Sequence, residues 1–146
     1  MHRFLALVLL ALGGLVLVQG ATPRPSRARS AVTAQSSDYG RILIDGRGYA
    51  LYAFTRDRAR RSACSNACAK AWPPFVVTRR PRAGRGVKTS LLGTIRRKDG
   101  RLQATYAGRP LYHYVGDRKP RQVLCQNVRE FGGLWLVVRP NGTLVR

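Results

Sequence analysis

The sequence predicts a mainly β fold: a small antiparallel β domain built from two pseudo-repeats of about sixty residues, with one short helix. Three observations predict it. The segment LYAFTRD at residues 51–57 returns as LYHYVGD at residues 111–117. Short runs of β-branched and aromatic residues alternate with turns rich in Gly, Asp and Asn, as in β-hairpins. One Ala-rich segment, SNACAKAW at residues 65–72, has a helical pattern and stops at two prolines.

The two repeats align at an offset of sixty positions, with small insertions needed in their second halves. Two copies are too few for a solenoid, so we expect them to pack on each other around one core. The predicted repeats span residues 40–78 and 101–139. The matched pairs are Gly48 with Gly108, Leu51 with Leu111, Tyr52 with Tyr112, Asp57 with Asp117, Cys64 with Cys125 and Trp72 with Trp135.

Turn residues divide the predicted domain into its elements. Gly, Asn and Asp tolerate the positive φ values that tight hairpin turns require, and Asn-Gly is the strongest short signal among them. In chain order we predict a hairpin turn at 45–48, the helix at 65–72, a strand at 74–77, turns at 98–100 and 107–110, a strand at 134–138 and a last turn at 141–142.

The N-terminus predicts export. Residues 1–20 combine an early basic residue with an uninterrupted run of apolar residues and Gly, which is typical of a secretory signal peptide. Residues 21–37 are rich in Pro, Arg, Ser and Thr, so we expect a disordered basic linker there and a folded domain over residues 38–146. A lipoprotein signal needs a Cys directly after the apolar run, and none precedes Cys64. The sequence therefore predicts a secreted or extracytoplasmic protein without a lipid anchor.

The charge points to anionic partners. Lys and Arg total 27 against 6 Asp and Glu, a formal net charge of +21. Such a surface attracts polyanions, among them anionic envelope polymers, lipid surfaces and nucleic acid. We do not expect nucleic acid, because an exported protein seldom meets it. The basic residues are dispersed along the chain, so the alternative that they reflect codon usage stays open.

Paired aromatic residues and carboxylates mark both repeats. Alternation along residues 51–57 places Tyr52 and Phe54 on one strand face, and we expect such aromatics to pack in the core. Asp57 and Asp117 end their strands, where a carboxylate commonly accepts backbone N–H bonds from the following turn. An acid and base pair is the alternative, if the repeats bring the two carboxylates together. The second copy places Tyr112 and Tyr114 in the same way.

These residues resemble a known family. Residues 52–57 and 112–117 both fit the motif Tyr-x-(Phe/Trp/Tyr)-x-x-Asp of a secreted repeat family of unknown function, described as predicted lipoproteins. The CSNAC segment leading to WPP, the phrase GRPLY and the phrase FGGLW fit it as well, so the resemblance covers nearly all of the predicted domain. It implies an extracytoplasmic bacterial protein and no particular activity. The missing lipoprotein cysteine departs from the pattern.

The cysteines allow several chemistries. Cys64 and Cys68 lie one helical turn apart, within reach of a disulfide, and export favours oxidation. A bond from Cys125 to either of them would instead tie the repeats together. Cys125 is otherwise expected as a small buried hydrophobe. A zinc or copper site made by Cys64, Cys68, Cys125 and His113, or a redox role for the thiols, remains an alternative.

Recognised catalytic signatures are absent from the sequence. It has no phosphate-binding Gly-rich loop, no GxSxG and no HExxH, and only His113 follows the predicted signal peptide. We therefore expect no enzyme and no cofactor. The predicted function is an envelope-associated binding or structural module, and the alternative is a thiol-based protein that binds zinc or copper or handles electrons.

Overall fold

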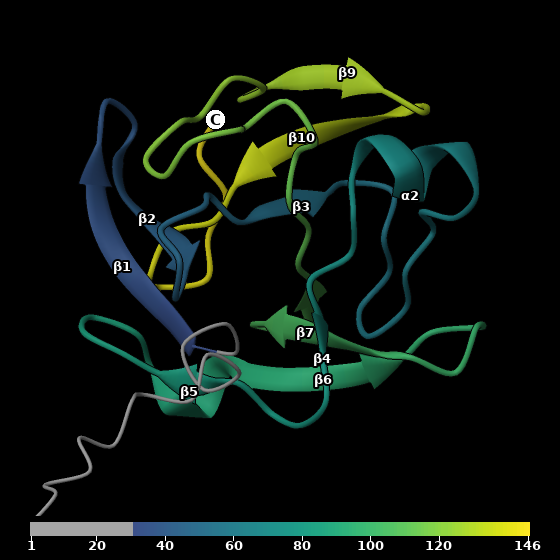
Figure 1. Cartoon of the computed structure of the whole chain (residues 1–146), viewed down its shortest axis with the longest axis horizontal. Coiled ribbons are helices and arrows are strands. Elements are labelled where there is room, and N and C mark those ends of the chain that lie inside the picture. The colour runs from purple at the N-terminus through teal and green to yellow at the C-terminus, as the bar shows by residue number, and fades with distance from the viewer. Residues whose placement is uncertain (1–30) are drawn as a thin grey trace, which may run out of the picture.

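The computed structural model describes residues 31–146 and confirms a mainly β fold (Figure 1). The predicted signal peptide and residues 21–30 of the predicted linker lie outside the described residues. The elements are β1 (Ala31–Ser37), β2 (Gly40–Asp45), β3 (Tyr52–Phe54), α2 (Ala67–Ala71), β4 (Val76–Val77), β5 (Arg82–Ala83), the 3-10 turn η1 (Thr89–Leu91), β6 (Leu92–Arg96), β7 (Leu102–Tyr106), β8 (Arg109–Pro110), β9 (Val128–Glu130) and β10 (Gly133–Val137).

The predicted linker over residues 21–37 is wrong for its last seven residues. Ala31–Ser37 forms β1, which pairs with β2 from Val32 opposite Asp45 to Ser37 opposite Gly40. The side chain of Val32 is completely buried. The composition of this segment lacks a strand pattern, but the backbone of the apolar strand β2 supplies its partner, so pairing overrides local preference. The folded domain therefore begins before Asp38.

The strands form three small sheets, with the orders β2-β1-β5, β3-β10-β9 and β4-β7-β6, and β8 attached to β7. Figure 1 shows β1 and β2 on one side, β10 and β9 along the top and β6 and β7 along the bottom, with β3 between them. The pairs are antiparallel, as predicted, except for a short parallel pairing of β5 with β1. Residues of all three sheets pack together in one buried cluster, among them Leu43 of β2, Ala53 of β3 and Ala104 of β7.

The last strand of each repeat pairs with the other repeat. β4, which follows Trp72, is antiparallel to β7 of the second repeat, while β10 of the second repeat is antiparallel to β3 of the first. The backbone repeats this exchange: Leu43 N–H donates to Val138 O at 2.8 Å, and Ala104 N–H donates to Phe75 O at 2.9 Å. The repeats are therefore interlocked rather than merely side by side.

Buried side chains divide into two clusters, whereas the sequence predicted one core. Tyr52 and Phe54 belong to a cluster with both tryptophans, and Leu51 and Ala53 belong to the other cluster. The predicted alternation along this strand is correct, but both of its faces are covered by protein. A strand with two buried faces separates two apolar regions, which explains why β3 is buried throughout.

The predicted turns lie where the sequence placed them, and the helix is shorter than predicted. Ala107 and Gly108 have φ values of 49° and 74°, the conformation of a tight hairpin turn between β7 and β8. Gly142 N–H donates to Arg139 O at 2.9 Å in the last hairpin. The helix α2 begins after Asn66, and no side chain caps its first turn. It ends at Ala71, and its C-cap Trp72 lies directly before the two prolines.

Candidate functional site

The two motif tyrosines bind the motif aspartates of the opposite repeat. The Tyr52 hydroxyl donates to Asp117 Oδ2 at 2.7 Å, and the Tyr112 hydroxyl donates to Asp57 Oδ2 at 2.8 Å. Between them, each of Tyr52 and Tyr112 donates its backbone N–H to the carbonyl oxygen of the other at 2.9 Å. Reciprocal contacts of this kind are the signature of an approximate twofold axis. The repeated motif thus supplies the contacts that join the two repeats.

The second oxygen of each aspartate accepts a bond from its own repeat. Asp57 Oδ1 accepts from Ala63 N–H at 2.7 Å, and Asp117 Oδ1 accepts from Leu124 N–H at 3.0 Å. Each carboxylate therefore ties a loop of its own repeat to a tyrosine of the other. The side chains of Tyr52 and Tyr112, which donate to these carboxylates, are completely buried. This geometry gives the two carboxylates a structural use, matching the turn role that the sequence favoured for them.

The aromatic side chains cross between repeats as well. The Trp72 and Trp135 rings stack with their centroids 4.0 Å apart and an interplanar angle of 3°. Phe54 of the first repeat stacks on Trp135 at 4.2 Å, and Tyr114 of the second repeat contacts Trp72 at 4.7 Å. Four aromatic rings therefore form one column through the interface, in which each repeat covers the tryptophan of the other. Trp72 Nε1 also donates to Glu130 at 2.7 Å.

Burial changes the acidity of both pairs. Desolvation of Asp57 raises its pKa to about 6, although hydrogen bonds from Ala63 N–H and Tyr112 oppose the rise. Desolvation also raises the pKa of Asp117, against the hydrogen bond from Tyr52. The pKa values of Tyr52 and Tyr112 are raised by burial and by the facing carboxylates. The tyrosines are thereby held as neutral donors.

Asp57 is expected to make stability depend on pH. Its folded pKa of about 6 exceeds the ordinary aspartate pKa of 3.8, so the folded chain binds this proton more tightly than the unfolded chain does. The stabilisation that this proton gives to the folded chain is fully present below about pH 4, and it is lost as the pH rises through about 6. Relative to Asp57→Asn, we expect the free energy of unfolding of the native chain to fall by on the order of 2 kcal/mol between pH 4 and 7.

Urea unfolding of both chains across this pH range measures the difference. Asp117 and Asp45 are present in both chains, so their own titrations cancel in the comparison where they act independently. Parallel pH curves for the two chains would show that the carboxyl of Asp57 has its ordinary acidity.

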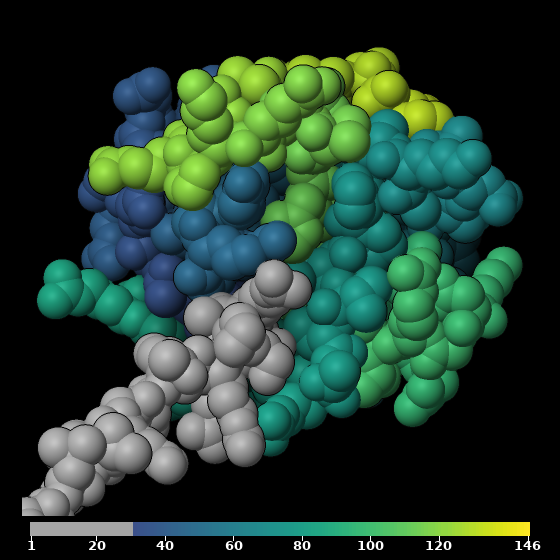
Figure 2. Space-filling view, viewed as in Figure 1, coloured from purple at the N-terminus to yellow at the C-terminus, as the bar shows by residue number. Residues whose placement is uncertain are grey.

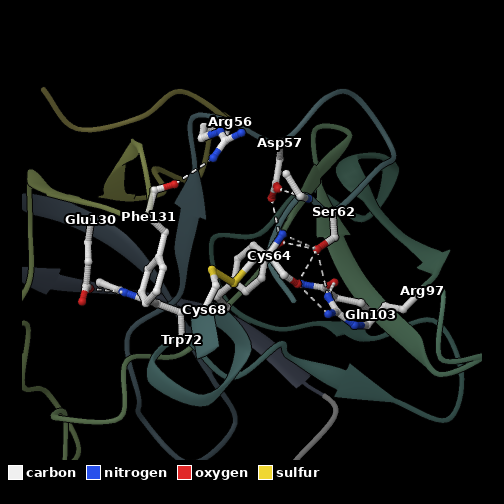
Figure 3. The surroundings of a disulfide bond; sticks show 12 residues. Arg56, Asp57, Ser62, Cys64, Cys68, Trp72, Arg97, Gln103, Glu130 and Phe131 are labelled. Carbon is white, nitrogen blue, oxygen red and sulfur yellow. Dashed lines mark hydrogen bonds between the residues drawn. A yellow bond between two sulfur atoms is a disulfide. The ribbon is translucent and has the colours of Figure 1, made fainter. Parts of the chain in front are cut away.

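Cys64 and Cys68 are joined in a disulfide, with their Cα atoms 5.3 Å apart (Figure 3). Cys125 is a free, half-buried thiol that packs against the tryptophan-containing cluster. A hydrogen bond with Cys125 raises the pKa of Tyr114. The disulfide pairing that the sequence favoured is thus present, and Cys125 is neither a disulfide partner nor fully buried.

His113 lies beside a buried carboxylate. Its Nε2 is 3.1 Å from Asp45 Oδ2, and Asp45 is completely buried. Burial is the largest influence on Asp45 and raises its pKa, but hydrogen bonds from His113, Tyr49 N–H and Arg47 N–H outweigh it and lower the pKa to about 2. Within residues 31–146 no group of three or more His, Cys, Asp and Glu side chains is placed to hold a metal ion. Cys64, Cys68, Cys125 and His113, which the sequence offered for zinc or copper, therefore do not lie together as one ligand set among these residues.

An open groove of about 1620 Å³ is lined mainly by charged and polar residues. One wall is the segment that leads into α2, and the other is the β6–β7 hairpin; Figures 1 and 2 show the two segments on the same side of the molecule. Asp99 is the one acidic residue in its lining. Nine basic residues line it: Arg56, Arg58, Arg60, Arg61, Lys70, Arg96, Arg97, Lys98 and Arg101.

A tight turn presents three of these arginines. Arg58 N–H donates to Arg61 O at 3.2 Å, and Arg61 N–H donates back to Arg58 O at 2.9 Å. Arg60 has a φ of 62°, in the left-handed region that few side chains adopt, and its N–H is held by Gly108 O at 3.0 Å. The second repeat therefore fixes the shape of a basic turn in the first. Sequence reasoning missed the groove, since the signal was a local ARR run among charges dispersed elsewhere.

Arg97 is the buried member of this set. Its side chain is 7% exposed. Nη1 donates to Gln103 Oε1 at 2.6 Å and to Ser62 Oγ at 3.0 Å, and Nη2 donates to Cys64 O at 2.7 Å (Figure 3). These partners are all neutral. The Ser62 hydroxyl is also 2.8 Å from the Tyr112 hydroxyl, so the polar floor of the groove is continuous with the tyrosine and aspartate pairs.

The fold and the crossed motif contacts define a single β domain made of two interlocked repeats. The chain belongs to the family described as a secreted repeat of unknown function, whose model matches residues 33–76 and 93–139. No curated protein and no solved structure matches the chain. In the part that the structure describes, neither helix has the length or apolar character needed to cross a bilayer.

The matched segments correct the predicted repeat boundaries. Residues 40–78 and 101–139 were predicted, but the family repeats begin at residues 33 and 93. The difference arises because β1 has little apolar patterning and was not recognised as a strand, whereas the strand before the predicted turn at 98–100, β6, was left outside the second repeat. Each repeat therefore opens with a complete hairpin, β1–β2 or β6–β7.

Proposed function

We propose that this chain is an exported, envelope-associated module that binds anionic polymers in the basic groove. The observation that carries the proposal is the groove itself, where nine cationic side chains face one carboxylate. That carboxylate, Asp99, already binds Arg101, whose Nη2 lies 2.7 Å from Asp99 Oδ2. The groove therefore presents a large excess of positive charge.

Location and charge support the same function. The family is described as secreted, and the apolar N-terminal segment predicted as a signal peptide agrees with export. Outside the cytoplasm the abundant polyanions are envelope polymers and lipid headgroups. A groove lined by one sign of charge concentrates such ligands and speeds their association. Interactions of this type weaken with salt, because bound polyanions release counterions as they are neutralised.

A pair of charge-matched variants tests the proposal. We expect Arg58, Arg60 and Arg61 changed together to Gln to weaken binding of long-chain inorganic polyphosphate by about tenfold or more, because the three exposed arginines share one turn. The slope of log affinity against log salt should fall by about 2. Fluorescence anisotropy of labelled polyphosphate at several salt concentrations measures both quantities.

The control changes Arg79, Arg118 and Arg129 to Gln. All three are exposed and none lines the groove, so the net charge changes by the same amount. The control should retain nearly all of the affinity. Equal losses in the two variants would mean that dispersed charge, and not the groove, attracts the polymer, and the proposal would then be abandoned.

A further inference from the structure

We infer that the groove contains a discrete subsite for a single phosphate group, anchored by the guanidinium of Arg97. This inference rests on the proposed function and names the chemistry that the groove selects. The starting observation is a buried cation with incomplete pairing. The side chain of Arg97 is 7% exposed, and its Nε has no hydrogen-bond partner within residues 31–146.

Buried arginines normally face a carboxylate, because leaving a charge unpaired away from water is costly. The nearest carboxylate here is Asp99, whose Oδ2 lies 3.7 Å from Arg97 Nε, beyond hydrogen-bonding distance. Asp99 is occupied by Arg101, which donates its backbone N–H, Nε and Nη2 to the two carboxylate oxygens. Asp99 and the more distant Asp57 are therefore the anionic neighbours of Arg97, and neither carboxylate hydrogen-bonds its guanidinium.

The guanidinium is also held in a prepared orientation. Gln103, which accepts from Arg97 Nη1, is completely buried and donates its own Nε2 to Leu111 O at 2.8 Å. Ser62 is held through its contacts with Tyr112 and with Cys64 N–H. A rigid cation loses little entropy when it binds, which separates it from the flexible arginines of the rim. The neighbouring disulfide anchors the Cys64 segment that accepts from Nη2.

Phosphate is the anion that this surrounding suits. It offers acceptor oxygens in several directions, so it can meet a fixed guanidinium and the rim arginines together. Arg58, Arg60 and Lys98 line the same groove and supply further cations there. A phosphodiester of an envelope polymer and a phosphate headgroup of a lipid share this chemistry. The subsite binds the phosphate, whichever molecule carries it.

The carboxylate of Asp99 competes with phosphate for the guanidinium of Arg97. Asp99 is the acidic residue of the groove lining and the nearest anionic neighbour of Arg97 Nε. Repulsion between its carboxylate and an entering phosphate opposes binding. Removing that charge should therefore strengthen phosphate binding, whereas changing Arg97 should weaken it. If Arg97 and Asp99 had only structural roles, changing them would not alter phosphate affinity in opposite directions.

The test follows the Hε–Nε resonance of Arg97 by NMR while inorganic phosphate is added at constant ionic strength. We expect a saturable shift with phosphate and little shift with acetate at the same concentrations. Arg97→Lys should weaken phosphate binding, followed by neighbouring amide resonances, by about tenfold or more. Asp99→Asn should tighten it severalfold, and Arg118→Gln, an exposed change outside the groove, should alter it by less than about twofold.

Other outcomes overturn the inference. An Arg97 resonance that does not saturate, or an Asp99→Asn chain that binds phosphate more weakly, rules out the subsite even if Arg97→Lys fails to fold. Polyphosphate binding that survives such a result leaves the groove function in place without the subsite. Saturable phosphate binding at Arg97 without polyphosphate binding keeps the subsite and removes the polymer function. Phospholipid vesicles, added in place of polyphosphate, distinguish the two sources of the phosphate.

Discussion

Neither repeat is expected to fold when it is produced without the other. A chain of residues 31–80 lacks β10, the partner of β3, and a chain of residues 81–146 lacks β4, the partner of β7. Each also loses one tryptophan of the stacked pair and the aspartate that accepts from its buried tyrosine. Unpaired strands and an uncovered aromatic face cannot offset the entropy of ordering such short chains.

Circular dichroism and amide NMR of the separate halves measure this expectation. Each half alone should give the narrow amide dispersion of an unfolded chain. Mixing the two at equal concentration should restore the dispersed spectrum of the intact domain, because every exchanged contact is then available again. A well-dispersed spectrum from either half alone would contradict the interlocked arrangement and would favour two independent units.

Replacing Trp135 by Ala should have the largest effect of any single substitution. Trp135 is completely buried and touches aromatic rings of both repeats: Trp72 at 4.0 Å, Phe54 at 4.2 Å and Tyr112 at 5.1 Å between centroids. Trp→Ala changes in cores cost about 3–5 kcal/mol, because surrounding side chains relax only partly into the space left behind. A small domain has about 5–15 kcal/mol in total, so much of the stability would be lost.

Urea unfolding followed by circular dichroism gives the change in free energy of unfolding. Val115→Ala is a suitable control, since Val115 is 58% exposed, and should change stability by less than about 0.5 kcal/mol. A loss below about 1 kcal/mol for Trp135→Ala would mean that the aromatic column does not stabilise the interface between the repeats.

Local signals predicted much of the fold. The matching segments around Tyr52 and Tyr112 revealed the repeat, and the family match confirms it. Hairpin turns were predicted from Gly and Asn, because these residues tolerate the backbone angles that tight turns need. Cys64 and Cys68 were predicted as a disulfide from their spacing of four residues and from export, and the bond forms although Cys64 precedes the helix α2. Each of these features is set by residues close together in the chain.

Other features depend on partners that are distant in sequence. β1 was assigned to the linker because its residues show no apolar pattern, and its strand conformation comes from pairing with β2. Alternation correctly separated the two faces around Tyr52 but could not show that both faces are buried. The groove was missed, since its basic residues come from segments about thirty to forty-five positions apart along the chain.

The amino-acid sequence alone determined that this protein is a basic, mainly β chain with two copies of a tyrosine and aspartate motif. Tertiary structure alone decided that each tyrosine binds the aspartate of the other copy, that the last strands are exchanged, and that the arginines of two segments line one groove. The physical reason is range. Turn preference and strand alternation act over a few residues. Hydrogen bonds between the repeats, and the combined charge of arginines from two segments, require parts of the chain that only folding brings together.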